Sequence, residues 1–246
     1  MLPSGFSDIV LDVLPFGAGL RQPDWYGNHR YAIIDAAASF DALHGFGRIF
    51  KPKTNVAIIV SLHATKMLGA GEGGIVYVND PEIASKIRSF CNFGFDSRSG
   101  LRHSKSFGSN LKMSEYSAAV ALASFSRWDE VRQDSIQRIG IARSISKRSG
   151  FSVHSAMDEG YANPYWIIRS GEEELISSLL EKSREHKVDV RKWWGIGCHT
   201  MPAYSSIRRD KLPITERVGS RYLGLPFHRF LKTDDWNRIE LFLGSI

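Results

Sequence analysis

The sequence has little cysteine and no long apolar run. Cys91 and Cys198 are the two cysteines among 246 residues. Two are too few for a disulfide framework, and their spacing is not that of metal ligands. No apolar stretch approaches the about 20 residues that span a bilayer, and residues 1–5 lack the basic start of a signal peptide. We therefore predict a cytoplasmic protein with two reduced thiols and no membrane contact.

The sequence also lacks a strong charge imbalance. The chain carries 32 Lys and Arg against 26 Asp and Glu, a formal net charge of +6, and 43% of its residues are hydrophobic. This composition predicts a globular protein with a real core. The basic residues are spread along the chain, so anionic small molecules are as good a match as nucleic acid. A basic nucleic-acid-binding module is an alternative that needs a clustered positive face.

Several catalytic motifs are missing. No Gly-x-Ser-x-Gly occurs, and the histidines have no metal-ligand spacing. Residues 69–74 match Gly-x-Gly-x-x-Gly, but a dinucleotide fingerprint needs a helix after its glycines. Here an apolar run of strand type, Ile75–Val78, follows instead. We reject the dinucleotide interpretation, and expect either a tight hairpin or a turn that lets backbone pass close to a flat ligand.

Short apolar runs dominate the first third of the chain and predict strands. Two of them show no alternation, which is typical of strands buried on both faces in a parallel sheet covered by helices. Ligands of open α/β sheets sit beyond the carboxyl ends of such strands, so Asp35, Ser61 and Lys66 could converge on one rim. The predicted strands are Ile9–Leu14, Tyr31–Ile34, Val56–Val60 and Ile75–Val78.

Helices are predicted after this region. Asp80 is a plausible cap for a helix over Glu82–Cys91, and Ser114 for one long helix from Glu115 to about Arg148. The pattern restarts near Gly150, which favours a small α+β domain on the long helix. Its predicted elements are a strand Tyr165–Ile168, a helix Glu172–His186, a strand Val188–Val190 and a helix Asp234–Leu243 capped by Thr233. We place the domains at 1–135 and 136–246.

Lys66 is the candidate for chemistry, because it lies at a strand end beside a hydroxyl and a glycine-rich turn. Such an amine suits an aldehyde cofactor, although most lysines are solvated surface charges. Asp35 has two interpretations. A helix cap is the commoner role, whereas the functional one is an acid that keeps a pyridinium nitrogen protonated. For His63, a structural hydrogen bond is favoured over catalysis.

The chain resembles the DegT/DnrJ/EryC1/StrS family of aminotransferases. Ser61–Lys66 followed by Gly71–Gly74 is similar to the family's Schiff-base segment, and Ile34–Ala37 to the segment whose Asp meets the pyridine nitrogen. The resemblance covers nearly the whole chain, with every motif in order. The further matching segments are Gly108–Glu115, His199–Tyr204, Leu212–Glu216 and Leu223–Pro226.

The resemblance implies fold type I of the pyridoxal-phosphate-dependent transferases: an incomplete, mostly parallel large-domain sheet and a small α+β domain. It implies that Lys66 carries the cofactor and moves a proton, that Asp35 holds the ring nitrogen protonated, and that Ser61 binds the cofactor phosphate. Asn110 would reach the phosphate of the partner subunit's cofactor in a homodimer. The implied reaction aminates a nucleotide-linked keto sugar, with glutamate as donor, in amino-sugar or surface-polysaccharide biosynthesis. Lysine at position 66, rather than the histidine of related dehydratases, favours transamination.

Three departures accompany the resemblance. Family members have a long segment before the strand that ends in the paired aspartate, so we expect about three sheet strands to be absent and apolar surface to be exposed. Ala38 stands where many relatives have Gln or His, and Ile34 where they have Glu. The first departure favours a truncated chain, and the alternative to an active aminotransferase is therefore a catalytically inactive fragment of this family.

Overall fold

The computed structural model describes residues 9–20, 26, 29–46, 55–95 and 103–246. Residues 1–5, on which the absence of a signal peptide was predicted, lie outside the described residues. The chain divides into two compact units, Met1–Val131 and Arg132–Ile246. The boundary predicted between residues 135 and 136, and the role of each domain, stay predictions.

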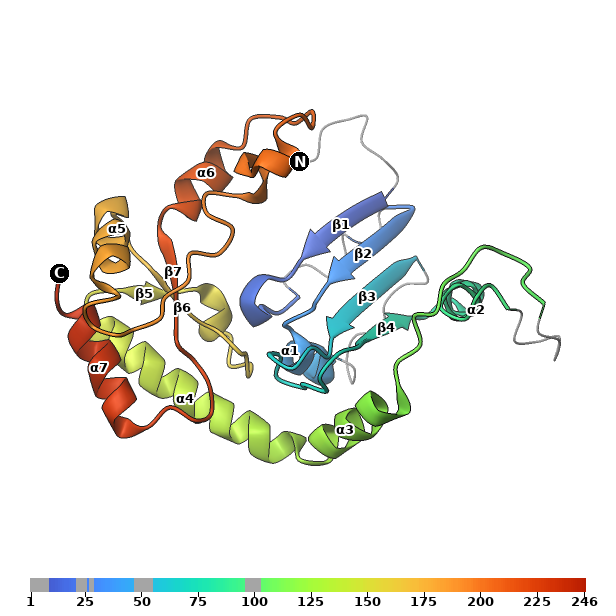
Figure 1. Ribbon diagram of the computed structural model, residues 1–246, viewed down its shortest axis with the longest axis horizontal. Coiled ribbons are helices and arrows are strands. Elements are labelled where there is room, and N and C mark those ends of the chain that lie inside the picture. Colours follow the sequence, from blue (N-terminus) through green and yellow to red (C-terminus); the bar gives the residue numbers. More distant parts are fainter. Residues whose placement is uncertain (1–8, 21–25, 27–28, 47–54, 96–102) are drawn as a thin grey trace. The chain divides into compact units, whose positions relative to one another are not determined.

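Unit 1 is built on a four-stranded mixed sheet in the order β1-β2-β3-β4 (Figure 1). The first three strands run parallel and β4 is antiparallel to β3. All four predicted strands are confirmed, but the burial on both faces predicted for two of them is wrong, because burial alternates along β2 and β3. Their bounds are β1 Ile9–Val13, β2 Tyr31–Asp35, β3 Val56–Ser61 and β4 Gly74–Val78.

One face of this sheet forms a core. Ala32, Ile34, Val56 and Ile58 are at most 2% exposed and pack in one cluster with Leu14, Leu20, Tyr26 and Ala36. The hydroxyl of Tyr26 donates to Asp12 on β1. Burial, and then this bond to a carboxylate, raise the pKa of Tyr26.

The other face of the sheet is exposed and apolar. Strand side chains alternate between faces, and the register places one residue set of all four strands on this side. Exposed apolar surface was predicted for the sheet edge, and it extends across a whole face. Six members are between 38% and 66% exposed: Ile9, Leu11, Val13, Tyr31, Ile59 and Val76.

The capping residue predicted for α2, which spans Pro81–Phe90, is confirmed. The Asp80 carboxylate accepts hydrogen bonds from the N–H groups of Glu82 and Ile83, at 2.7 and 3.1 Å. Pro81 takes the first helical position, where no N–H is needed.

Asp80→Ala is expected to destabilise α2 by about 1 kcal/mol, because two N–H groups lose their acceptor. The helix buries none of its residues completely, so the loss is local and speeds amide exchange in its first turn. Asp80→Asn keeps an acceptor oxygen and should exchange nearly as slowly as the parent chain. Equal acceleration in both variants would contradict the capping role.

The single long helix predicted from Glu115 to Arg148 is wrong. It is two helices, α3 (Glu115–Ser126) and α4 (Trp128–Arg148), separated at Arg127, whose φ and ψ are −105° and 16°. The Ser126 hydroxyl donates to the carbonyl of Ala123 at 2.8 Å, and the Arg127 N–H bonds three residues back to Ser124. Such local bonds compete with the helical ladder. The predicted cap holds, since the Ser114 hydroxyl accepts from the N–H of Ser117.

Unit 2 contains an antiparallel three-stranded sheet in the order β5-β6-β7. The predicted strand at Tyr165–Ile168 is β6, shifted by one residue. The other elements of the fold are β5 Ser152–Val153, β6 Trp166–Arg169, β7 Tyr222–Leu225, α1 Phe40–Phe46, α5 Glu173–Lys182, α6 Pro213–Gly219 and α7 Thr233–Leu243, with short 3-10 turns at Pro15–Gly17, Ser155–Met157, Cys198–Thr200 and Pro202–Tyr204.

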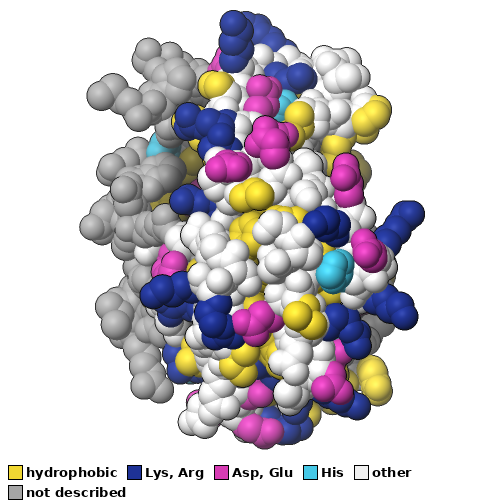
Figure 2. All heavy atoms as spheres, turned by 90° about the vertical axis from the view of Figure 1, so that its left-hand side faces the viewer, with side chains coloured by type: hydrophobic (Ala, Val, Ile, Leu, Met, Phe, Trp, Pro, Cys, Tyr) yellow, Lys and Arg dark blue, Asp and Glu magenta, His cyan; other side chains and the backbone are white. Residues whose placement is uncertain are grey.

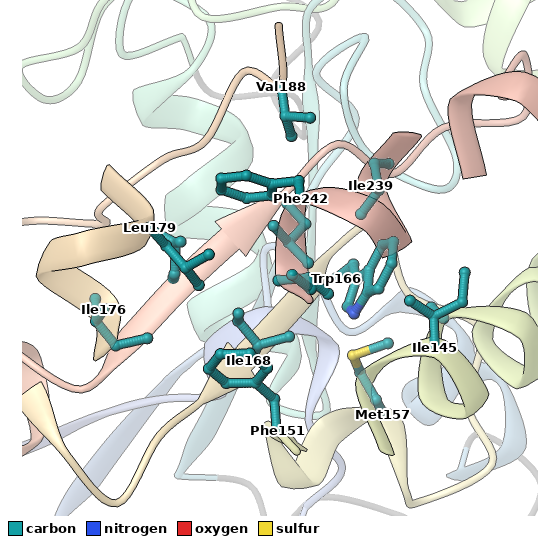
Figure 3. Close-up of a cluster of buried hydrophobic side chains, with 14 of the residues drawn as sticks. Ile145, Phe151, Met157, Trp166, Ile168, Ile176, Leu179, Val188, Ile239 and Phe242 are labelled. Atoms are coloured by element: carbon teal, nitrogen blue, oxygen red, sulfur yellow. The ribbon is translucent and has the colours of Figure 1, made fainter. Parts of the chain in front are cut away.

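The core of unit 2 gathers around Trp166, which is fully buried (Figure 3). Its indole N–H donates to the Ser146 hydroxyl at 2.9 Å, and that hydroxyl donates to the carbonyl of Ala142 at 2.8 Å. Side chains from α4, β6, α5 and α7 surround it, among them Ile145, Ile168, Leu179 and Phe242. This core is contributed by segments about 100 residues apart in the sequence.

Three predictions in unit 2 need correction. Helix α5 ends at Lys182 rather than at 186, and Val188–Val190 is no strand. Lys187 has a φ of +54°, and the Val188 N–H bonds back to the carbonyl of Ser183, so the chain reverses there. Thr233 is the first residue of α7 rather than its cap, since the Asp235 carboxylate accepts the Lys232 N–H at 2.9 Å.

Charged side chains of both signs are interspersed on the face of the molecule in Figure 2, where Lys and Arg alternate with Asp and Glu. None of the described helices is both long and apolar enough to cross a bilayer. Among the described residues, no group of three or more His, Cys, Asp or Glu could hold a metal ion.

Candidate cofactor site

Asp35 and Ser61 end neighbouring parallel strands of unit 1 and lie on the same face of the sheet. Asp35 pairs with Ile59 of β3, and Ser61 follows two residues later. Because side chains two residues apart share a face, both polar groups project from the exposed apolar face at its carboxyl rim. Gly74, opposite Ser61 on β4, leaves the space beside the hydroxyl without a side chain. The sequence predicted that these residues meet at one rim, and the strand register adds that Asp35 and Ser61 share a face.

The Asp35 carboxylate is half-buried and holds the backbone that follows it. One oxygen, Oδ1, accepts the N–H of Ala37 at 3.0 Å. The alternative prediction, a helix cap, is wrong, because α1 begins only at Phe40 and this bond spans a turn that follows β2. Within the described residues, Oδ2 takes no hydrogen bond. A carboxylate fixed through one oxygen can present the other to a cationic ring N–H.

The Ser61 hydroxyl is fixed in a similar way. Its oxygen accepts the N–H of His63 at 3.2 Å. A serine hydroxyl also carries one donor, and within the described part of the chain that proton has no acceptor. It is available for an anionic oxygen.

Lys66 lies on the turn that follows β3 and is half-buried. Its N–H donates to the carbonyl of His63 at 2.9 Å. Leu62 and Leu68, on either side of the turn, are buried at 2% and 4% exposure in a cluster with Ala70 and Trp128. The backbone around Lys66 is thus anchored to a core on both sides.

The glycine-rich turn predicted to be a hairpin does connect β3 to antiparallel β4. A Cβ on Gly69 would stand 2.8 Å from the carbonyl oxygen of Ala64, and one on Gly73 would stand 2.6 Å from Met113 Cε. Gly73 also has a φ of +139°, which L side chains rarely adopt. The Ser124 hydroxyl holds this turn by donating to the Gly69 carbonyl at 3.0 Å.

Asn110 lies apart from this group. It is exposed and forms an isolated antiparallel bridge with Asn92 beyond α2. No contact within the described residues joins it to Asp35, Ser61 or Lys66. The structure therefore places Asp35 and Ser61 on one face at neighbouring strand ends and Lys66 on the turn that follows, and the roles of all four residues stay predictions.

Sequence comparison identifies the family. The sequence profile of the DegT/DnrJ/EryC1/StrS aminotransferase family matches residues 31–241. The chain belongs to this family. It is 26% identical to GDP-perosamine synthase of Caulobacter vibrioides over 232 residues, which cover 89% of this chain and 59% of that protein.

Two solved structures share the fold. DesI, crystallised with its TDP-sugar product, is 27% identical with a TM-score of 0.79, over 98% of this chain and 63% of DesI. A Bacillus cereus ATCC 10987 protein assigned to the PLP-dependent aminotransferases is 24% identical with a TM-score of 0.83, over 96% of this chain and 65% of that protein. The predicted α/β fold of type I is confirmed.

The chain spans about half the length of the curated relatives it matches, between 50% and 59% for three of them. Pyridoxal phosphate is the cofactor of the family, and the chemistry of Lys66, Asp35 and Ser61 fits it. An amine, a carboxylate with an uncommitted oxygen and a hydroxyl with an uncommitted proton match an aldehyde, a ring nitrogen and a phosphate.

His63 makes more contacts in this turn than the sequence predicts. His63 was expected to make a structural hydrogen bond, and it makes several around Lys66. Its position inside the lysine motif was the available signal.

Proposed function

We propose that the chain is a pyridoxal-phosphate-dependent aminotransferase that acts on a nucleotide-linked keto sugar, with glutamate as the amino donor. One observation carries the proposal. Asp35 and Ser61 project from one face at adjacent strand ends, and Lys66 lies on the next turn. Relatives named for nucleotide-sugar amination support the substrate class, including the UDP-2-acetamido-2-deoxy-3-oxo-D-glucuronate aminotransferase of Pseudomonas aeruginosa.

The chain's own residues would divide the work between binding and proton transfer. When bound, the cofactor supplies an electron sink for the carbon that loses a proton. Lys66 would hold the cofactor through its aldehyde and, once the donor's amine has displaced its own, would move the proton with that freed amine. Asp35 would hold the ring N–H proton with its second oxygen, Oδ2, while Oδ1 accepts the N–H of Ala37. Ser61 would donate a hydrogen bond from its hydroxyl to the phosphate.

The proposal also covers the oligomeric state of the protein and its location in the cell. Asn110 would donate to the cofactor phosphate of a second subunit, in a homodimer whose sites are shared. Its exposure on the segment beyond α2 is compatible with contact to another copy. We propose a cytoplasmic location, which agrees with the two free thiols of Cys91 and Cys198. We also propose a role in amino-sugar or surface-polysaccharide biosynthesis.

A specific observation favours a second candidate, a catalytically inactive member of the family. The apolar face that carries Asp35 and Ser61 is exposed in this chain, with Leu11 at 66%. Charged groups attract a cofactor less strongly in water than in a dry pocket. Cofactor binding without amino transfer would identify this second candidate.

Titration of the 246-residue chain with pyridoxal phosphate tests the proposal. We expect a saturable visible absorption band, which glutamate should abolish and a nucleotide-linked keto sugar should restore.

Asp35→Asn keeps the bond to Ala37 but loses the charge at the ring nitrogen. It should bind the cofactor about 10- to 100-fold more weakly, the effect of one charged hydrogen bond. Asp129→Asn, an exposed site on α4, is the control. A folded chain without a saturable band would refute the proposal.

A further inference from the structure

The ring of His63 points back into the turn that carries Lys66. Its Nδ1 accepts the backbone N–H of Thr65 at 3.2 Å and lies 2.8 Å from the Thr65 hydroxyl. On the other side of the ring, Nε2 lies 3.7 Å from Oε1 of Glu72. The Glu72 side chain is 83% exposed, so this contact is weak. The stronger contacts of the ring are therefore those with Thr65, the residue before Lys66.

The contact with Thr65 fixes the proton on the ring. A backbone N–H can donate to Nδ1 only if that nitrogen presents its lone pair. A neutral imidazole has one donor nitrogen and one acceptor nitrogen, so its proton stands on Nε2, toward Glu72. The ring is therefore an acceptor for the residue directly before Lys66.

The backbone of His63 closes the same turn from both ends. Its N–H donates to the Ser61 hydroxyl oxygen at 3.2 Å, and its carbonyl accepts the Lys66 N–H at 2.9 Å. The neighbouring carbonyl of Gly71 accepts the N–H of Ala64 at 2.8 Å. One residue thus touches both the proposed phosphate-binding hydroxyl and the backbone of the proposed cofactor lysine.

We propose that His63 is a positioning residue, whose Nδ1 holds the Thr65 N–H and so fixes the direction in which Lys66 leaves the turn. This inference rests on the proposed function of Lys66. The physical reason is geometric. A lysine side chain has four rotatable bonds, so the backbone direction at its Cα is what the fold can set. Well-defined orientation of a reacting group is worth large factors in rate.

Amide exchange in the chain without cofactor tests the first half of this inference. His63→Ala removes the acceptor, and the Thr65 N–H should exchange about 2- to 10-fold faster, as expected for one hydrogen bond. His63→Asn places Oδ1 near the position of Nδ1 and should restore slow exchange. His63→Gln places its amide near the position of Nε2 and should not. Equal exchange in all four chains would overturn the inference.

Capture of pyridoxal phosphate by Lys66 tests the second half. We expect the initial rate of borohydride-fixed capture to fall about 10-fold in His63→Ala and His63→Gln and to recover in His63→Asn. Unchanged capture, with altered Thr65 exchange, would overturn the positioning role and leave the proposed function intact. No capture by the parent chain would instead refute the proposed function, and the exchange data would still decide whether His63 holds the turn.

Discussion

Lys66→Ala is expected to abolish covalent capture of pyridoxal phosphate while the chain stays folded. In the parent chain, we expect the cofactor aldehyde to join the Lys66 amine and borohydride to fix it there. Mass spectrometry would detect this as an adduct on the peptide that contains residue 66. The side chain of Lys66 is half-buried, and the buried Leu62 and Leu68 anchor the turn on either side of it, so its loss should not unfold the turn. Amino transfer should fall at least about 10²- to 10⁴-fold, the contribution of a positioned proton carrier.

Lys86→Ala is the matched control for this experiment. Lys86 is an exposed lysine of α2 in the same unit, so it measures adventitious reaction of the aldehyde with surface amines. The adduct should persist there at the level of the parent chain. An equal adduct on the Lys66→Ala chain would mean that residue 66 is not the cofactor lysine.

Trp166→Ala is expected to lower the free energy of unfolding of unit 2 by about 3–5 kcal/mol. The indole is fully buried, and its removal leaves a large cavity among Ile145, Ile168 and Phe242. It also leaves the Ser146 hydroxyl without the indole donor. Domains are stable by only about 5–15 kcal/mol, so this loss removes a large part of the free energy of unfolding of unit 2. Urea denaturation followed by far-UV circular dichroism measures it, as a lower midpoint at similar slope.

Trp194→Ala is the control: it makes the same replacement of tryptophan by alanine but leaves no buried cavity. Trp194 belongs to the same unit, and 52% of its surface is exposed. Its φ of +53° is equally strained for tryptophan and alanine. Its replacement should change stability by less than about 1 kcal/mol. Similar losses at positions 166 and 194 would contradict the proposed role of the Trp166 core.

Local chemistry explains where prediction from the sequence succeeded. The apolar runs of β1 to β4 were found because burial in a sheet dictates their composition, and α2 because Asp80 and Pro81 mark a helix start. The helix break at Arg127 is not predicted because it depends on one local contact, the bond from the Ser126 hydroxyl to the carbonyl of Ala123. The apolar Val188 and Val190 predict a strand. Val188 is buried in the core of unit 2, but a chain reversal at Lys187 places it there.

The sequence by itself determined the family, the strand ends and the identity of Asp35, Ser61 and Lys66, because residue types and their order are local properties. Tertiary structure decided which oxygen of Asp35 is uncommitted, that Asp35 and Ser61 share a face, and that the ring of His63 faces Thr65. It also decided that the face beside them is exposed. The shared and exposed face depends on register and on packing between segments distant in the chain, which residue order does not specify. The contacts of Asp35 and His63 depend on the local backbone conformation of the turns that follow β2 and β3.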